Sequence, residues 1–357
     1  MDFKKIKTSP KDGVGYRKEY YDGVLSLIDR ETERAALARS EGMTPGALAA
    51  DPEKYRDAFC RMLGWPLSKY SHEYSPAVRK QLVETAGGLR IYRLSVETLK
   101  GLWFSGIIFE PEDKKPDAPL VFIMPGGSYR VEDLIPHGDY TCWQYRDIGA
   151  RVLESGAVLF APQLLVCSEP ESGYYMDTTR SFIDAKLKAL GGSIAALEIF
   201  NVRRVIDYFV ANEEIDAGRI GMAGLSYGGF YTLYTAASET RIKSVFSSCF
   251  FCDRFCEREK DASPSLPGTR PDWLWQNSAH SFFDAEVAAL IAPRALYIEN
   301  GSTDSLFPIE SVKTEYERLK PYYEAAGAGD RLMLYIGENG HEVSDNIRGF
   351  EFFMKNI

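Results

Sequence analysis

The residues best suited to chemistry lie in the segment Arg219–Phe230, which reads Arg-Ile-Gly-Met-Ala-Gly-Leu-Ser-Tyr-Gly-Gly-Phe. Its centre has the spacing Gly-x-Ser-x-Gly at Gly224, Ser226 and Gly228. An apolar run precedes the motif and a helical pattern follows it, as expected of a serine on a tight turn between strand and helix. Such a turn exposes the hydroxyl, and the helix N-terminus favours a nearby negative charge. A glycine-rich turn with an unreactive serine is the alternative interpretation.

A serine hydroxyl is a poor nucleophile unless a base accepts its proton, and four histidines could serve. His341 is favoured because it follows the last expected strand, which suits the chain order serine, acid, histidine. His72 lies in the helical N-terminal region, and His137 follows the strand expected at 120–124. His280 lies in an aromatic-rich loop, where it is a candidate for substrate binding.

The base itself needs an acid that orients it. Asp304 follows the strand expected to end at Glu299 by one turn, so it is the predicted acid. Glu299 would lie within that strand, and Glu310 would lie within the next helix, so both fit less well. Because aspartate also favours turns and helix caps, a purely structural Asp304 is the alternative.

Stabilising a tetrahedral oxyanion requires two backbone amides that point at one spot. We expect the first from Tyr227, directly after the serine. The second should come from the loop Pro125–Tyr129, whose glycines permit the amides to turn inward. Gly127 and Ser128 are both candidates for this second donor, and an ordinary turn is the alternative.

From residue 89 onward, apolar strands and amphipathic helices alternate along the chain. The wholly apolar run Leu120–Met124 is typical of a strand covered on both faces. The alternation predicts an α/β fold with a mainly parallel sheet, in which ligands bind at the carboxyl ends of the strands. Other strands are expected at 89–96, 102–109, 157–161, 219–223, 242–247, 294–299 and 332–336, and helices at 140–155, 193–211, 227–237, 309–325 and 345–355.

Residues 1–88 are expected to form a helical extension, and residues 89–357 the catalytic domain. Tyr20, Val24 and Leu27 recur at helical spacing in the extension. It should pack on the main domain or help to pair subunits as a homo-oligomer.

Two long loops, 163–192 and 250–283, interrupt the alternation and are expected to wall the pocket like a cap. The second holds Trp273 and Trp275, with Phe282 and Phe283 nearby. The two indoles, together with His280, are the candidates for substrate binding. Packing within the cap is the alternative, since aromatic clusters serve both purposes.

The composition narrows the partners of this chain. A net charge of −9 argues against nucleic acid, and no apolar run is long enough for a membrane span. The first ten residues lack the apolar core of a signal peptide, so we expect a cytoplasmic protein.

Six cysteines in 357 residues fit reduced thiols in a reducing compartment. Cys249, Cys252 and Cys256 have a spacing that would make half a metal site, but no second pair of ligands accompanies them. We therefore expect ordinary thiols there, no metal and no cofactor.

These residues resemble the α/β-hydrolase fold family over roughly 89–357. Gly224–Gly229 is similar to the elbow of dienelactone-hydrolase-like, acetyl-xylan-esterase-like and prolyl-oligopeptidase-like members, and Ile291–Asp304 resembles their acid-bearing strand. Leu190–Glu198 is similar to the helix before the elbow in acetyl-xylan-esterase-like proteins. The loop Pro125–Tyr129 lacks the histidine of the His-Gly-Gly-Gly form that many esterases carry, and a β-propeller does not fit the helical N-terminal region.

The resemblance implies Ser226 as nucleophile, Asp304 as acid and His341 as base. The expected function is hydrolysis of small carboxylic esters, including acetyl esters of small molecules or sugars. A peptidase or amidase of the same fold is one alternative, with Glu169, Glu171 or Asp177 available to anchor a substrate amine. A binding protein that keeps the fold without the chemistry is the other.

Overall fold

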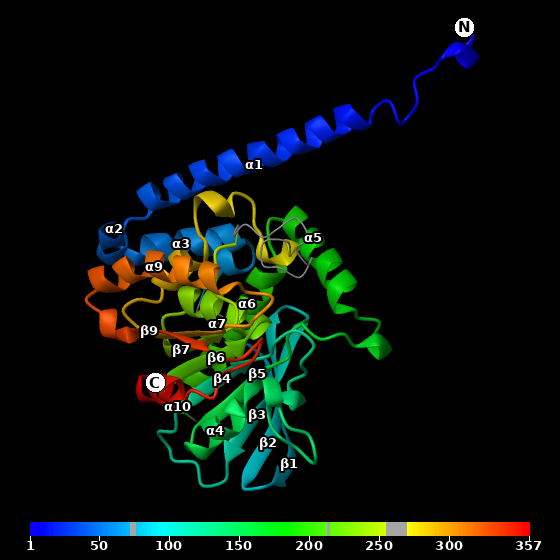
Figure 1. Cartoon of the computed structure of the whole chain (residues 1–357). Coiled ribbons are helices and arrows are strands. Elements are labelled where there is room, and N and C mark those ends of the chain that lie inside the picture. Colours follow the sequence, from blue (N-terminus) through cyan, green and yellow to red (C-terminus); the bar gives the residue numbers. More distant parts are fainter. Residues whose placement is uncertain (72–75, 213–214, 255–269) are drawn as a thin grey trace.

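A computed structural model describes residues 1–71, 76–212, 215–254 and 270–357 (Figure 1). His72, Cys256 and most of the first half of the loop 250–283 lie outside these ranges. Nine strands form one sheet in the described residues: β1 (Val78–Ala86), β2 (Leu89–Leu99), β3 (Leu102–Pro111), β4 (Leu120–Met124), β5 (Val158–Pro162), β6 (Ile220–Leu225), β7 (Ile242–Ser248), β8 (Ala295–Gly301) and β9 (Leu332–Gly337). The described helices are α1 (Val14–Gly42), α2 (Pro45–Ala50), α3 (Pro52–Leu63), α4 (Ile148–Glu154), α5 (Ser181–Ala189), α6 (Ile194–Ala211), α7 (Tyr227–Ser238), α8 (Asp284–Ala289), α9 (Ile309–Ala325) and α10 (Ile347–Lys355).

The strand order is β1-β2-β3-β5-β4-β6-β7-β8-β9. Strands β5, β4 and β6 to β9 pair in parallel, while β1, β2 and β3 form an antiparallel ribbon at one end of the sheet. The fully buried β4 and β6 lie near the middle, as their unbroken apolar runs predict. The expected mainly parallel sheet is confirmed.

Helices cover both faces of the sheet, and each face has its own hydrophobic core (Figure 1). One core holds residues of α3, α6, α7 and α9 against the sheet. The opposite core holds residues of α4 and α10. Along the fully buried central strands β4, β5, β6 and β8, both faces are covered, and the elbow lies at the carboxyl end of β6.

Three expected elements differ from the structure. Residues 78–86 were expected in the helical extension but form β1, because Gly87 and Gly88, with φ of 61° and 79°, make a tight turn into β2. The expected loop 163–192 contains α5, whose only buried residue is Asp184, so no apolar stripe announces it. The helix expected at 140–155 is shorter, because Arg146 and Asp147 have φ of 46° and 52° and interrupt it before α4.

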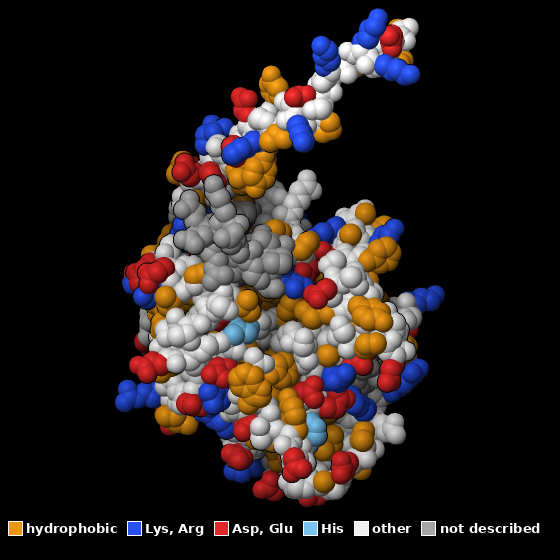
Figure 2. Space-filling view, turned by 45° about the vertical axis from the view of Figure 1, so that its right-hand side comes forward, with side chains coloured by type: hydrophobic (Ala, Val, Ile, Leu, Met, Phe, Trp, Pro, Cys, Tyr) orange, Lys and Arg blue, Asp and Glu red, His pale blue; other side chains and the backbone are white. Residues whose placement is uncertain are grey.

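Helix α1 projects from the body as an arm (Figures 1 and 2). Among its residues only Ala35 and Arg39 are buried, while Tyr20 and Ile28 are 78% and 49% exposed. The N-terminal part of the extension therefore does not pack on the main domain in this chain alone. In the described ranges, no helix combines the length and apolar composition that crossing a bilayer requires.

Candidate active site

Ser226 lies on the tight turn between β6 and α7, and its backbone has a positive φ. Its φ is 60° and its ψ is −118°, a costly conformation for a residue with a side chain. The turn requires glycine on both sides. A Cβ on Gly228 would lie 2.1 Å from the carbonyl oxygen of Met124, and one on Gly224 would lie 2.4 Å from the Gly228 backbone. The glycine spacing seen in the sequence is thus a packing requirement of this turn.

Asp304 and His341 are joined by a hydrogen bond of 2.8 Å between Asp304 Oδ2 and His341 Nδ1. The other carboxylate oxygen, Oδ1, accepts from the amides of Leu306 (2.8 Å) and Phe307 (3.3 Å). The Phe307 ring stacks on the imidazole at a centroid distance of 5.7 Å. The Asp304 side chain is fully buried and that of His341 is 22% exposed, so the imidazole is partly accessible from solvent.

The three residues follow β6, β8 and β9, which lie in one parallel set with β7 between β6 and β8. The Ser226 amide donates to the carbonyl of Ser248 at the end of β7 (2.9 Å), and the Cys249 amide donates to the carbonyl of Glu299, two residues before the end of β8 (2.9 Å). Parallel strands end at the same edge, so the structure brings Ser226, Asp304 and His341 to one edge of the sheet.

The loop that carries His341 is fixed on both sides by residues that the sequence did not single out for this role. Gln144 donates from side-chain Nε2 to the His341 carbonyl (3.2 Å), and the backbone carbonyl of Gln144 accepts from the Val343 amide (2.7 Å). Glu299, buried in β8, accepts the Ser344 amide at 2.9 Å. Burial raises the pKa of Glu299, although its bonds to Ser344 oppose that rise.

The loop Pro125–Tyr129 approaches the elbow as expected. The Ser128 amide donates to the Val166 carbonyl at 2.7 Å, and Ser128 has a φ of 70°. Gly127 lies against the Tyr227 ring and Met176, since a Cβ on it would be 3.4 Å and 3.3 Å from them. Because the Ser128 amide is already bonded, Gly127 is the better placed of the two predicted donors.

A buried ionic network lies behind Tyr227, and the sequence did not reveal it. Arg180, 1% exposed, pairs with Glu198 (3.0 Å) and Asp272 (2.8 Å). Tyr227 donates its hydroxyl to Asp272 at 2.8 Å. Burial alone would raise the pKa of Asp272, but Arg180, together with Arg270 and the Tyr227 hydroxyl, outweighs burial and lowers it. The network joins both long loops to α6 and α7.

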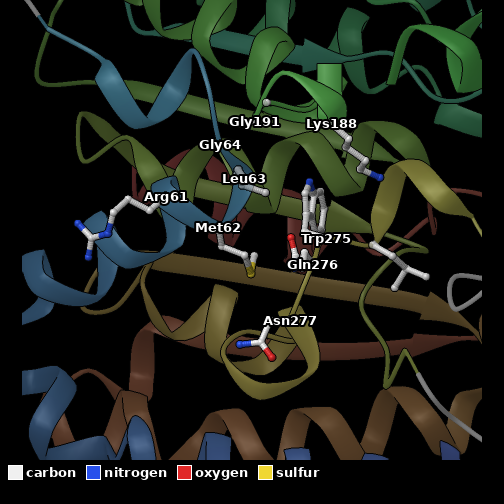
Figure 3. A pocket seen from close by; sticks show the side chains of 11 residues that line it. Arg61, Met62, Leu63, Gly64, Lys188, Gly191, Trp275, Gln276 and Asn277 are labelled. Carbon is white, nitrogen blue, oxygen red and sulfur yellow. The ribbon is translucent and has the colours of Figure 1, made fainter. Parts of the chain in front are cut away.

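Trp273 and Trp275, predicted for substrate binding, are 3% and 8% exposed and pack with aromatic residues of α7. Trp273 contacts the Tyr227 ring at a centroid distance of 4.7 Å. Trp275 also lines a pocket of about 680 Å³ between α3, the end of α5 and the loop at 274–277 (Figure 3). None of the three triad candidates lines this pocket, and binding of substrate by either indole stays a prediction.

The remaining histidine candidates lie elsewhere. His280 is exposed, in a short turn that packs against α1. His137 is exposed, and its Nδ1 is 3.0 Å from the carbonyl of Ile135. The alternative acid Glu310 is exposed on α9 and pairs with Lys313. These positions leave His341 as the described histidine joined to the predicted acid.

No family model matches the chain. A curated protein, "Putative hydrolase YtaP" of Bacillus subtilis (strain 168), is 28% identical over 150 residues, which cover 42% of this chain and 49% of that protein. The chain therefore matches about half the length of this relative.

Solved structures resemble the chain over most of its length. A glucuronoyl esterase from Solibacter usitatus has a TM-score of 0.63 at 15% identity, covering 86% of this chain and 91% of its own. Acetyl xylan esterase 1 from Thermoanaerobacterium sp. JW/SL YS485 has a TM-score of 0.54 at 14% identity, covering 85% and 92%. With its mostly parallel nine-stranded sheet, helices on both faces and a serine elbow after β6, this chain has the α/β-hydrolase fold.

Proposed function

We propose that this protein is a serine ester hydrolase in which Ser226, His341 and Asp304 act as a catalytic triad. The observation that carries the proposal is the 2.8 Å hydrogen bond from His341 Nδ1 to Asp304, at the strand edge that also presents the Ser226 elbow. This bond holds the imidazole in the tautomer whose Nε2 is free to accept a proton.

In the proposed reaction, Ser226 Oγ attacks the ester carbon while His341 Nε2 takes the hydroxyl proton. His341 then returns that proton to the departing alkoxide, which leaves as an alcohol and an acyl-serine. Water attacks the acyl-serine by the same route and regenerates the enzyme. Asp304 stays ionised and stabilises the imidazolium in both halves.

The amides of Tyr227 and Gly127 would stabilise the oxyanion. Tyr227 is the first residue of α7, where the amides lack partners within the helix and the helix dipole favours negative charge. Gly127 faces the Tyr227 ring, and Ser128 fixes the loop by its bond to Val166. Removing one such donor costs about 3 kcal/mol of barrier in comparable sites.

For the substrate, we propose a small carboxylic ester, including acetyl esters of sugars. The support is the likeness of fold to proteins named as an acetyl xylan esterase and a glucuronoyl esterase. The peptidase alternative would need an acidic anchor for an amine. Of its candidates, Glu169 pairs with Arg130 and Asp177 lies 3.7 Å from Arg270, so neither stands as an unopposed negative charge.

The test is turnover by the purified Ser226→Ala variant. We expect p-nitrophenyl acetate hydrolysis to fall to background, and a fluorophosphonate probe to label the unmodified protein at Ser226 but not the variant. Ser302→Ala, beside the acid loop, is a control that should keep both properties. Turnover that survives in Ser226→Ala would refute the assignment, and absence of both turnover and labelling in the unmodified protein would favour the binding-protein alternative.

Comparison of acetylated sugars, longer acyl esters and peptide amides then separates the esterase from the peptidase. We expect faster cleavage of the acetyl esters. Faster cleavage of a peptide amide that carries a free N-terminal amine would instead identify the protein as a peptidase.

A further inference from the structure

Cys249 lies within the catalytic cluster although the proposed reaction does not use it. Its Sγ, one carboxylate oxygen of Asp304 and one ring nitrogen of His341 all lie within 4.8 Å of one another. Within the described parts of the chain, this is the one such group of three or more potential metal ligands. Thiolate, carboxylate and imidazole are the three ligand types that zinc takes in proteins.

The backbone conformation of Cys249 places its thiol close to the loop that carries His341. Cys249 is the first residue after β7 and has a φ of 49°, a left-handed conformation that few residues with a side chain adopt. Its side chain is fully buried, and Sγ lies 3.5 Å from the Glu342 carbonyl oxygen and 3.9 Å from that of Gly340. These two carbonyls flank His341, so the thiol sits beneath the loop that carries the proposed base.

The site differs from the one that the cysteine spacing suggests. Cys249 belongs to the core on the α4 and α10 side of the sheet, whereas Cys252 belongs to the opposite core. The Cys252 amide is bonded to Asp284 rather than facing the triad. The ligands that accompany Cys249 therefore come from the acid and histidine loops, which the sequence pattern could not associate with it.

Distance and charge both suit zinc. Tetrahedral zinc with bonds of about 2.0–2.3 Å holds its ligand atoms roughly 3.3–3.8 Å apart. A separation at the 4.8 Å limit of this cluster would have to shrink by about 1.0–1.5 Å, and the Asp304–His341 pair, bonded at 2.8 Å, would have to open slightly. A thiolate and a carboxylate together carry two negative charges, which neutralise Zn²⁺ in a buried site. The soft thiolate favours zinc over magnesium or calcium.

We propose that Cys249, Asp304 and His341 bind a zinc ion reversibly, and that the bound ion switches the hydrolase off. The claim that zinc inhibits the enzyme rests on the proposed function, whereas the claim that zinc binds does not. Binding converts the Cys249 thiol to a thiolate, and its one proton goes to solvent. The ion takes His341 Nδ1 in place of the Nδ1–H bond to Asp304, and that proton reappears on Nε2 through exchange with water. An Nε2 that already carries hydrogen cannot accept the proton of Ser226.

Binding is tested with Co²⁺, a spectroscopic substitute for zinc, on the Ser226→Ala variant, so that the result does not depend on turnover. We expect a thiolate-to-cobalt charge-transfer band in the near ultraviolet, displaced by Zn²⁺. Adding Cys249→Ala or Cys249→Ser should remove the band, whereas Cys252→Ala, a matched buried cysteine, should keep it. The proposed zinc site would be overturned if the band survives both Cys249 changes, or if Ser226→Ala with Cys249 intact shows no band.

Inhibition is tested on proteins with Ser226 intact, each rate being expressed relative to the same protein in chelator. Zinc should inhibit the parent and Cys252→Ala at the same concentration, with recovery on chelation. The concentration for half inhibition should rise at least tenfold in Cys249→Ala. Equal inhibition of all three proteins would show that the Cys249 thiol is not a ligand of the inhibitory zinc. Normal activity with zinc bound would show that the ion does not switch the enzyme off. Either result would overturn the proposed switch.

Discussion

At the scale of single residues, the proposed mechanism makes the reactivity of Ser226 depend on the contact between Asp304 and His341. Replacing Asp304 by Asn keeps the size of the side chain but offers an N–H where His341 Nδ1 needs an acceptor, which favours the wrong tautomer. We expect kcat for ester hydrolysis to fall by about 10³–10⁴-fold with little change in KM. Glu310→Gln, at an exposed carboxylate on α9, should leave kcat unchanged. A fall of less than tenfold in Asp304→Asn would remove Asp304 from the triad.

Glu315 on α9 provides a residue-scale test of stability against pH. It is fully buried, and burial, together with the neighbouring Glu286, raises its pKa to about 8 despite the opposing Ala285 amide and Arg318. Its unfolded pKa is near 4.5, so its contribution to stability is complete below pH 4.5 and is lost as the pH rises toward about 8.

Glu315→Gln keeps an oxygen acceptor for the Ala285 amide (2.9 Å) and cannot ionise. The free energy of unfolding of this variant, minus that of the parent, should therefore grow by roughly 1.4 kcal/mol per pH unit between about 4.5 and 8. Urea titrations across this range measure the slope, with Glu310→Gln as the exposed control. A flat difference would mean that Glu315 ionises normally in the folded protein.

At the scale of elements, the Arg180 network fastens two long loops to the helices behind the elbow. Arg180→Met would leave Glu198 and Asp272 buried without their main cation. Breaking such a pair costs about 3–5 kcal/mol. Arg93→Met, which breaks an exposed pair with Glu132, should cost less than about 1 kcal/mol.

Chemical denaturation measures both changes, and limited proteolysis should cut the loop 163–192 faster in Arg180→Met. Because Tyr227 shares Asp272 with Arg180, the backbone amide of Tyr227, a proposed oxyanion donor, should also lose its fixed place, so kcat should fall more than KM rises. Equal stabilities of the two variants would show that the buried network is not needed to hold the loops.

The same elements show what the sequence could predict. Strands β4 and β6 and helices α6, α7 and α9 were predicted to within about two residues, because each has a continuous apolar run or a clear apolar stripe. Strand β1 and helix α5 were missed, since their side chains are largely exposed and carry little periodic signal.

The candidate site divides in the same way. The bond between Asp304 and His341 followed from chain order and strand ends. Arg180 and Gln144 could not be found, because they reach the site from elements distant in sequence and belong to no local motif. Cys249 stood out only for its spacing to Cys252 and Cys256, which gave no sign that it lies beside Asp304 and His341.

At the scale of the whole molecule, the arm formed by the N-terminal part of α1 should matter little for the folding of one chain, and its role in association can be tested separately. Its residues before Glu31 contribute none to either hydrophobic core, and apolar side chains such as Tyr20 and Ile28 are exposed there. Deleting residues 1–30 should change the free energy of unfolding at low protein concentration by less than about 1 kcal/mol. If the arm pairs subunits, which is one of the two roles expected from the sequence, sedimentation should show a dimer only with the arm present. Substantial destabilisation of a monomeric truncated protein would instead mean that the arm packs on the body.

The central claim is that Ser226 becomes covalently acylated with His341 as its base. The most direct measurement is rapid acid quenching of the enzyme with p-nitrophenyl acetate, followed by mass spectrometry of its peptides. We predict an acetyl group on Ser226, formed in a burst with p-nitrophenol, and its loss in both Ser226→Ala and His341→Ala. Turnover with no acylated Ser226 in any quenched sample, or acylation that proceeds unchanged in His341→Ala, would contradict it.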